Sequence, residues 1–134
     1  MINKCMKHST YICKNCGSES KWSRQKFNIY CSNTCKGEAQ FKKTIERFKL
    51  GKVSERLTLR KVLTEVKGYN CACCGIREYN NRPIVLQVDH IDGNAGNNMS
   101  ENLRLICPNC HSQTKSYGGG NKGKGRKARG LPLR

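Results

Sequence analysis

Long apolar runs, apolar side chains in general and acidic side chains are all scarce in this 134-residue sequence. No segment approaches the length that spans a membrane, and Met1 leads into no apolar run of the kind that forms a signal peptide. The chain is therefore expected in the cytoplasm. With 36% hydrophobic residues, it is expected to form one or two small domains rather than one large core.

Acidic side chains are also unevenly distributed. Residues 1–70 carry 16 Lys and Arg against 5 Asp and Glu, residues 71–114 carry 3 against 4, and residues 115–134 carry 7 against none. A nearly neutral middle segment therefore lies between two strongly positive flanks. One such flank is commonly just a solvated face, but two around one compact segment favour a clamp for nucleic acid.

Cysteine, in contrast, is abundant, with 10 residues that mostly fall in closely spaced pairs. In a basic chain without a signal peptide, such pairs indicate metal ligands rather than disulfides. Four thiolates close the coordination sphere of zinc, so a site of this kind is structural and cannot activate water. Two zinc sites are predicted: Cys13, Cys16, Cys31 and Cys35 in the first, and Cys71, Cys74, Cys107 and Cys110 in the second.

Four unrelated core cysteines are the disfavoured alternative for the second group, and three other residues leave the ligand sets open. Cys73 could displace Cys71 or Cys74, although only that pair has the usual two-residue gap. Cys5 and His8 could also join a metal site. Each structural zinc contributes an apparent ~10–16 kcal/mol to folding, which would offset the thin core.

Hydrophobic periodicity predicts a small α+β fold. Residues 34–50 and 54–67 have apolar side chains at helical spacing, with Thr34 and Ser54 as expected caps and Gly51 as the stop of the first helix. Residues 84–90 alternate as a strand, residues 92–98 have turn chemistry, and residues 103–106 form a second strand. A short helix is expected to open at His111, and residues 75–83 are expected to be a loop.

Asp89, His90 and His111 form a polar set apart from the cysteines. Asp89 and His111 offer a carboxylate and an imidazole, which suit one divalent ion with open coordination positions. His90, outside that coordination sphere, is free to take a proton from water at neutral pH. A His after a knuckle cysteine is often only a cap or a substitute zinc ligand. The presence of Asn102, 13 residues after Asp89, nevertheless supports the interpretation of these residues as one catalytic set.

The motif as a whole resembles the HNH nucleases that contain zinc knuckles. The matching residues are Asp89-His90-Ile91, Asn102-Leu103-Arg104 and Cys110-His111, and the flanking segments at 69–76 and 107–114 are similar to free-standing, often phage-borne, members. The resemblance covers roughly residues 54–117 and implies a ββα-metal nuclease core. The cysteines at 13–35, followed by a helix, resemble a treble-clef or ribbon-like zinc finger.

The resemblance also implies roles. His90 would be the general base that activates water, and Asn102 would tie the loop to the backbone and orient His90. Asp89 and His111 would hold a divalent metal on the scissile phosphate: magnesium, with manganese or another divalent ion as alternatives. A second metal histidine, which some members carry after His111, is absent, so loose binding through two side chains, water and phosphate is expected.

Three segments are expected from these assignments: an N-terminal zinc finger plus basic helix at 1–53, the nuclease domain with its structural zinc at 54–117, and a flexible basic tail at 118–134. The zinc finger either contacts DNA or only supports the helix, and the tail either follows DNA or only adds solubility. DNA, expected to be double-stranded, would be contacted by Arg104, Lys115, Lys122, Lys124, Arg126, Lys127 and Arg129.

The leading hypothesis is a metal-dependent HNH DNA endonuclease that nicks or cuts by hydrolysis, in the host-cell cytoplasm if it is phage-encoded. The alternative is a zinc-finger DNA-binding protein with an inactive HNH motif, against which the intact Asp89, His90, Asn102 and His111 argue. A structural or assembly protein fits the charge poorly. The sequence does not indicate which element would read bases, so target specificity, biological role and oligomeric state stay open.

Overall fold

The computed structural model describes residues 10–21, 29–119 and 130. The chain divides into two compact units, Met1–Thr44 and Ile45–Arg134. This division lies nine residues before the boundary expected between residues 53 and 54, because Phe48, near the end of helix α1 (Asn33–Lys49), is fully buried in the second unit. The three-segment division itself stays a prediction, and the basic tail lies almost entirely outside the described residues.

The first unit begins with a short antiparallel ribbon, β1 (Thr10–Ile12) and β2 (Glu19–Lys21), whose connection carries a cysteine knuckle. The knuckle closes through the amide of Gly17, which donates to the carbonyl of Cys13. Helix α1 follows, and its first-turn amide at Cys35 donates to the hydroxyl of Ser32 at 3.1 Å. Ser32 therefore caps this helix in place of Thr34.

Helix α1 ends as the sequence predicts, at Gly51. The amide of Gly51 donates to Phe48 and that of Lys52 donates to Arg47, both at 2.9 Å, which is the paired pattern of a Schellman motif. Gly51 has a positive φ of 67°, and a Cβ there would lie 2.8 Å from the sulfur of Met99. The positive φ favours glycine at this position, and a larger residue would also require the flexible Met99 side chain to shift.

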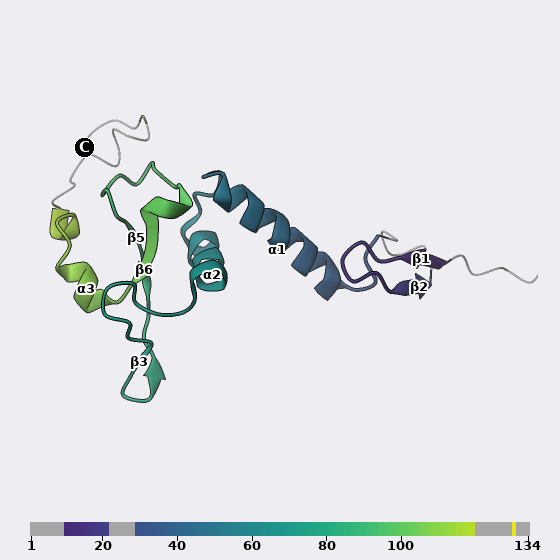
Figure 1. The fold of residues 1–134 in the computed structure, drawn as a ribbon, viewed down its shortest axis with the longest axis horizontal. Coiled ribbons are helices and arrows are strands. Elements are labelled where there is room, and N and C mark those ends of the chain that lie inside the picture. The colour runs from purple at the N-terminus through teal and green to yellow at the C-terminus, as the bar shows by residue number, and fades with distance from the viewer. Residues whose placement is uncertain (1–9, 22–28, 120–129, 131–134) are drawn as a thin grey trace, which may run out of the picture. The chain divides into compact units, whose positions relative to one another are not determined.

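The second unit is built on a two-stranded antiparallel ribbon, β5 (Gln87–His90) and β6 (Leu103–Ile106), with Asp89 opposite Arg104 and His90 opposite Leu103. Figure 1 shows α2 (Arg56–Lys67) on one side of this ribbon and α3 (Pro108–Ser112) on the other. Two 3₁₀ turns, η1 (Ser100–Asn102) and η2 (Tyr117–Gly119), precede β6 and follow α3.

A small apolar core holds these elements together. Leu103 and Leu105 on β6 and the inner face of α2 are almost completely shielded from water. Burying a side chain of this size stabilises a fold by about 1.5–3 kcal/mol, so a core with this few members contributes limited stability. Its members are Phe48, Val53, Leu59, Val62, Leu63, Leu86, Leu103, Leu105 and Ile106. This is the small α+β architecture that the sequence predicts.

Three further local expectations are wrong. Helix α2 begins one residue later than expected, with Glu55 rather than Ser54 at its N-cap and no side-chain cap bond. Helix α3 begins at Pro108 rather than His111, because proline suits the first helical position and the sulfur of Cys107 accepts from the amide of Cys110. Residues 75–83 contain a hairpin, β3 (Glu78–Tyr79) paired with β4 (Arg82–Pro83), rather than a plain loop.

The described helices include none that is both long enough and apolar enough to cross a membrane.

Candidate functional site

Both predicted cysteine groups converge. In each group of four, the sulfur atoms all lie within 4.8 Å of one another. Sulfurs at the corners of a tetrahedron around zinc are about 3.8 Å apart for Zn–S bonds of about 2.3 Å. The separations of 3.6 Å between Cys16 and Cys31 and 3.8 Å between Cys74 and Cys107 match that geometry. Each group can hold one metal ion, and four sulfur donors are the set that zinc prefers.

The structure shows which cysteines near residue 71 belong to the second four-cysteine group. Cys71 and Cys74 join Cys107 and Cys110, whereas Cys73 is exposed and lies outside the group. The amide of Gly75 donates to the carbonyl of Cys71 at 2.8 Å, which repeats the turn seen at Gly17 in the first knuckle. Cys5 and His8, whose roles the sequence left open, lie outside the described residues.

The surroundings of the thiols favour a bound cation. Burial of Cys71 opposes its ionisation, but amide hydrogens, chiefly that of Cys107, outweigh this and lower its pKa to about 6. Amides of Cys16 and Cys31 lower the pKa of Cys13 to about 6 in the same way. The neighbouring thiol of Cys35 helps to raise the pKa of Cys31 to about 12, since negative charge accumulates in the group. A metal ion would neutralise that charge.

Asp89 is the one buried charged residue among the described side chains, at 4% exposure. Its Oδ2 accepts a hydrogen bond of 2.7 Å from Nε of Arg104, its partner across the ribbon. This bond raises the pKa of Arg104 above its ordinary value. The guanidinium thus compensates the buried carboxylate but uses only one of its two oxygens.

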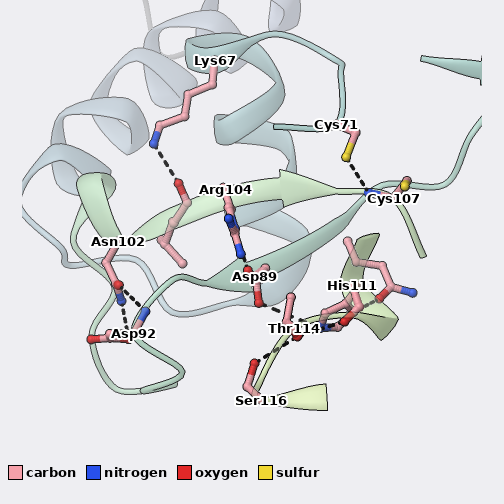
Figure 2. A network of polar contacts seen from close by, with 12 residues as sticks. Lys67, Cys71, Asp89, Asp92, Asn102, Arg104, Cys107, His111, Thr114 and Ser116 are labelled. Atoms are coloured by element: carbon pink, nitrogen blue, oxygen red, sulfur yellow. Dashed lines mark hydrogen bonds and ion pairs between the residues drawn. The ribbon is translucent and has the colours of Figure 1, made fainter. Parts of the chain in front are cut away.

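The other oxygen of Asp89 faces His111. Oδ1 of Asp89 lies 3.9 Å from Nε2 of His111, the first residue after the second pair of cysteines (Figure 2). The opposite ring nitrogen, Nδ1, donates to Oε1 of Gln87, which shares a strand face with Asp89. The ring of Tyr117 packs edge-on, with centroids 5.6 Å apart. These contacts fix the ring so that the lone pair of Nε2 is on the side of Asp89.

Asp89 and His111 fit one shared divalent ion. Ligands about 2.1 Å from an octahedral ion are about 3.0 Å apart when adjacent and about 4.2 Å apart when opposite. The observed 3.9 Å lies between these two values, so one ion could reach both atoms after a small shift of the side chains. Histidines that bind a metal through one ring nitrogen commonly donate a hydrogen bond from the other ring nitrogen, as His111 does to Gln87. The two residues expected to share a cation therefore face each other.

His90 is the last residue of β5 and follows Asp89 directly, so alternation places its side chain on the opposite face of the ribbon. Its Nε2 bonds Oδ1 of Asn98 at 3.0 Å. Because that oxygen can only accept, the proton belongs on Nε2 and the lone pair on Nδ1. His90 is thus held in a single tautomer with a basic nitrogen.

Asn102 closes the loop that follows His90. Its Oδ1 accepts from the amide of Asp92 at 3.0 Å, and its Nδ2 donates to the Asp92 carboxylate and to the carbonyl of Asn97 (Figure 2). The backbone carbonyl of Asn102 also accepts from the amide of Ile91. Both residues that follow His90 are therefore tied to Asn102, while the direct side-chain contact to His90 comes from Asn98.

Lys67 fixes the start of β6 from the end of α2. Its ammonium group donates to the carbonyls of Ser100 and Leu103, both at 2.7 Å. In Figure 2, Lys67 lies on the far side of the ribbon from His111. These carbonyls flank Asn102, so Lys67 acts on the backbone that carries this residue.

The structure describes only two of the residues that are predicted to contact DNA, Arg104 and Lys115. Arg104 donates to Asp89 and is only partly exposed, whereas Lys115 is exposed just after α3. Lys122, Lys124, Arg126, Lys127 and Arg129 lie outside the described residues. A role in DNA binding stays a prediction for all of them.

Sequence reasoning missed the residues that orient the site: Gln87 behind His111, Asn98 behind His90, Asp92 behind Asn102, and Lys67. Gln87 was recoverable, because residues two apart on a strand share a face. Asn98 was not, since it is one of several similar asparagines in a loop whose path depends on tertiary contacts.

Comparison with known proteins agrees with this geometry. Residues 71–116, which hold one cysteine group and the Asp89, His90, Asn102 and His111 set, match the family model described as HNH endonuclease. This segment is accordingly similar to the HNH endonucleases. The chain is also similar to the H-N-H endonuclease F-TflIV of Escherichia phage T5, with 43% identity over 65 residues.

That similarity covers 48% of this chain but only 29% of the phage protein, so the chain spans less than a third of its relative's length. No solved structure matches the chain significantly.

Proposed function

We propose that the protein is a metal-dependent DNA endonuclease that hydrolyses phosphodiester bonds. The observation that carries the proposal is the 3.9 Å approach of Asp89 Oδ1 to His111 Nε2 within the segment that matches the HNH family. The name of the phage T5 relative, an H-N-H endonuclease, supports the same activity.

Asp89 and His111 would hold the catalytic cation, magnesium in the first instance or manganese or another divalent ion. Oxygen and nitrogen donors from two side chains leave the other positions to water and phosphate, which suits a loosely bound ion. When bound, such an ion neutralises charge on the phosphate and stabilises the leaving 3′ oxygen. Gln87 orients His111, and Arg104 keeps the Asp89 carboxylate in place.

His90 would act as the general base. With the proton on Nε2 fixed by Asn98, Nδ1 takes a proton from water as the water oxygen bonds to phosphorus. The bond from phosphorus to the 3′ oxygen then breaks, and that oxygen takes up a proton to leave a 3′ hydroxyl and a 5′ phosphate. Asn102 contributes indirectly, because it holds Ile91 and Asp92 in the loop next to His90.

The two four-cysteine groups would each hold a structural zinc. Neither would take part in the reaction, because four thiolates leave no position for water or phosphate. The second group adjoins the site directly, since Cys110 precedes His111 in α3. Zinc there would fix the helix that presents His111, in a unit whose apolar core is thin.

DNA is the proposed partner, expected to be double-stranded. The net charge of +17 and its concentration on both flanks of the matched segment support a polyanionic substrate. Binding should weaken steeply as salt rises, because phosphate neutralisation releases counterions. The basic tail would add to this affinity.

A plasmid assay tests the proposal. Purified protein with magnesium should convert supercoiled plasmid to nicked or linear DNA, and a chelator should stop the reaction. His90→Ala should lower the rate by about 10²–10⁴-fold, the contribution of a general base, while duplex binding persists. Equal cutting by His90→Ala and the parent would remove His90 from the mechanism.

The alternative function, a zinc-finger DNA-binding protein with an inactive site, is supported by the two metal-ready cysteine groups alone. It predicts tight duplex binding and no cutting with magnesium, manganese or other divalent ions. The same plasmid assay therefore separates the two functions.

A further inference from the structure

The β3–β4 hairpin is a narrow ribbon that projects from the second unit (Figure 1). Its two central residues, Asn80 and Asn81, have positive φ values of 50° and 58°. Positive φ at both positions is the type I′ turn, whose twist matches that of paired strands. All residues from Arg77 to Pro83 are exposed. The hairpin is thus a regular element with both faces in water.

Its hydrogen-bonding pattern is consistent with a stable ribbon despite a proline. The amide of Ile84 donates to the carbonyl of Arg77 at 3.0 Å, which makes Arg77 and Ile84 a hydrogen-bonded pair. Such pairs alternate with non-hydrogen-bonded pairs along an antiparallel ladder. Pro83, which faces Glu78, falls at a non-hydrogen-bonded position and loses no ladder bond.

The side chains divide the ribbon into a basic face and an acidic face. Tyr79 and Arg82 are directly opposite each other, and Arg77 lies two residues before Tyr79, so these three side chains share one face. Glu78 points to the other. Within the described part of the chain, the side chains of Arg77, Tyr79 and Arg82 form no hydrogen bond or ion pair. The basic face therefore carries two guanidinium groups, one aromatic ring and unused donors.

The base of the hairpin is anchored on both strands. On one side, the amide of Cys71 in the knuckle donates to the carbonyl of Ile76 at 3.0 Å. On the other, the hydroxyl of Tyr69 donates to the carbonyl of Ile84, and Leu86 is fully buried. A ribbon fixed in this way can present its side chains in one orientation.

The hairpin is also close to the candidate site. Asp89 lies seven positions after Arg82. A fully extended chain spans at most about 3.6 Å per residue, so the two Cα atoms are at most about 25 Å apart. This is less than one turn of duplex DNA, about 34 Å.

Given the proposed nuclease function, we propose that the β3–β4 hairpin enters the major groove of the duplex within one turn of the cut and biases sequence choice. The major groove admits a two-stranded ribbon. Arg77 and Arg82 have the fork geometry that pairs with guanine, and the amides of Asn80 and Asn81 at the tip can pair with adenine. Glu78, on the opposite face of the ribbon, would point away from the base edges.

The test compares cut positions in a randomised duplex library for the parent and four variants. Arg77→Lys/Arg82→Lys keeps the charge but loses bidentate pairing, Arg77→Ala/Arg82→Ala loses both, and Tyr79→Ala removes the ring. Glu78→Ala, on the opposite face of the same ribbon, is the matched control. Equal zinc content and melting temperature establish that each variant is folded.

The parent should prefer particular bases within about ten base pairs of the cut. The double Lys variant should lose about tenfold or more of that preference while its duplex affinity stays within about threefold of the parent's, and Glu78→Ala should keep the preference. Unchanged preference in both double variants would overturn the inference. So would a uniform loss of affinity with a reduced salt dependence and the same preferred bases, which indicates backbone contact only.

A binding experiment distinguishes this inference from the proposed activity. The His90→Ala protein, without divalent metal, is used to select the duplexes that it binds from the same randomised library. If no protein cuts DNA but the selected bases depend on Arg77 and Arg82, the hairpin reads DNA and the nuclease proposal fails. If the parent cuts and selection ignores these residues, the hairpin inference fails alone.

Discussion

Replacing Arg104 with methionine tests the electrostatic balance at the centre of the site. Arg104 donates to Oδ2 of Asp89 at 2.7 Å, and Asp89 is almost fully buried. Methionine keeps much of the side-chain length and removes the positive charge. The variant therefore leaves a buried carboxylate without its compensating cation, which is costly in a medium that solvates charge poorly.

The size of the effect follows from exposure. Removing one partner of a buried ion pair costs about 3–5 kcal/mol. The side chain of Arg104 is 28% exposed, so water screens part of the interaction and the lower end, about 3 kcal/mol, is expected. A loss of 1 kcal/mol lowers the melting temperature of a domain of roughly 60–100 residues by about 4–8 °C, which gives about 12–24 °C.

Magnesium should act in the opposite direction. The guanidinium and a divalent ion both compensate the single negative charge of Asp89, so Arg104→Met should bind the ion more tightly than the parent. An ion at 100 times its dissociation constant stabilises the folded state by about 2.7 kcal/mol. Magnesium should therefore raise the melting temperature of the variant more than that of the parent, and recover most of the loss.

Thermal melts with and without magnesium measure both effects, with zinc content checked in each sample. Arg56→Met, which removes an exposed arginine from the first turn of α2, is the control and should change the melting temperature little. The reasoning is refuted by a variant that melts within about 2 °C of the parent, or by an equal magnesium shift in both proteins.

Three further predictions concern the support of the site. Lys67→Met should lower the free energy of unfolding by about 1.5–3 kcal/mol, because charged hydrogen bonds to two carbonyls are lost, and urea titration against the exposed Lys52→Met control measures this. Cys107→Ser should leave one zinc per chain instead of two by native mass spectrometry, and two retained ions would contradict the assignment of this group. Hydrogen bonds from the amide of Asn94 and from the side chains of Asn97 and Asn102 hold the pKa of Asp92 below its ordinary 3.8. As pH falls, Asp92 is therefore protonated at a higher pH in the unfolded chain than in the folded protein. The resulting stability is present above pH 3.8 and is lost as pH falls from there toward the lower folded pKa. Urea titrations should therefore show that the difference in free energy of unfolding between the parent and Asp92→Asn becomes smaller over that range. A difference that does not change with pH would contradict this prediction.

Elements with strict local spacing were predictable from the sequence. The closely spaced cysteine pairs, three of them C-x-x-C and one C-x-x-x-C, indicated both cysteine groups, because a tetrahedral ion tolerates few ligand spacings. The end of α1 was equally local, since a glycine with positive φ is what a Schellman motif requires. The β3–β4 hairpin was missed because Asn80-Asn81 is a less common type I′ turn than Asn-Gly, and only two residues on each side are paired.

The partner of Arg104 was not predictable, for a different reason. A positive residue in a nuclease motif suggests a phosphate contact, and nothing local argues against it. Its pairing with Asp89 depends on the register of β5 and β6, which are joined by the long loop between His90 and Leu103. A shift of one residue would reverse which side chains share a face, and that register is fixed by packing on α2 and α3 rather than by the loop.

The same register explains why Asp89 and His90 can be adjacent in the sequence and still serve different purposes. The strand continues through His90, so Asp89 lies on the face with Arg104 and His111, whereas His90 lies on the face of Val88. One step along the strand would therefore place the proposed cation ligand Asp89 and the proposed base His90 on different faces. A helix or a flexible loop would not impose that reversal, which is why the arrangement depends on β5 staying paired with β6 up to its last residue.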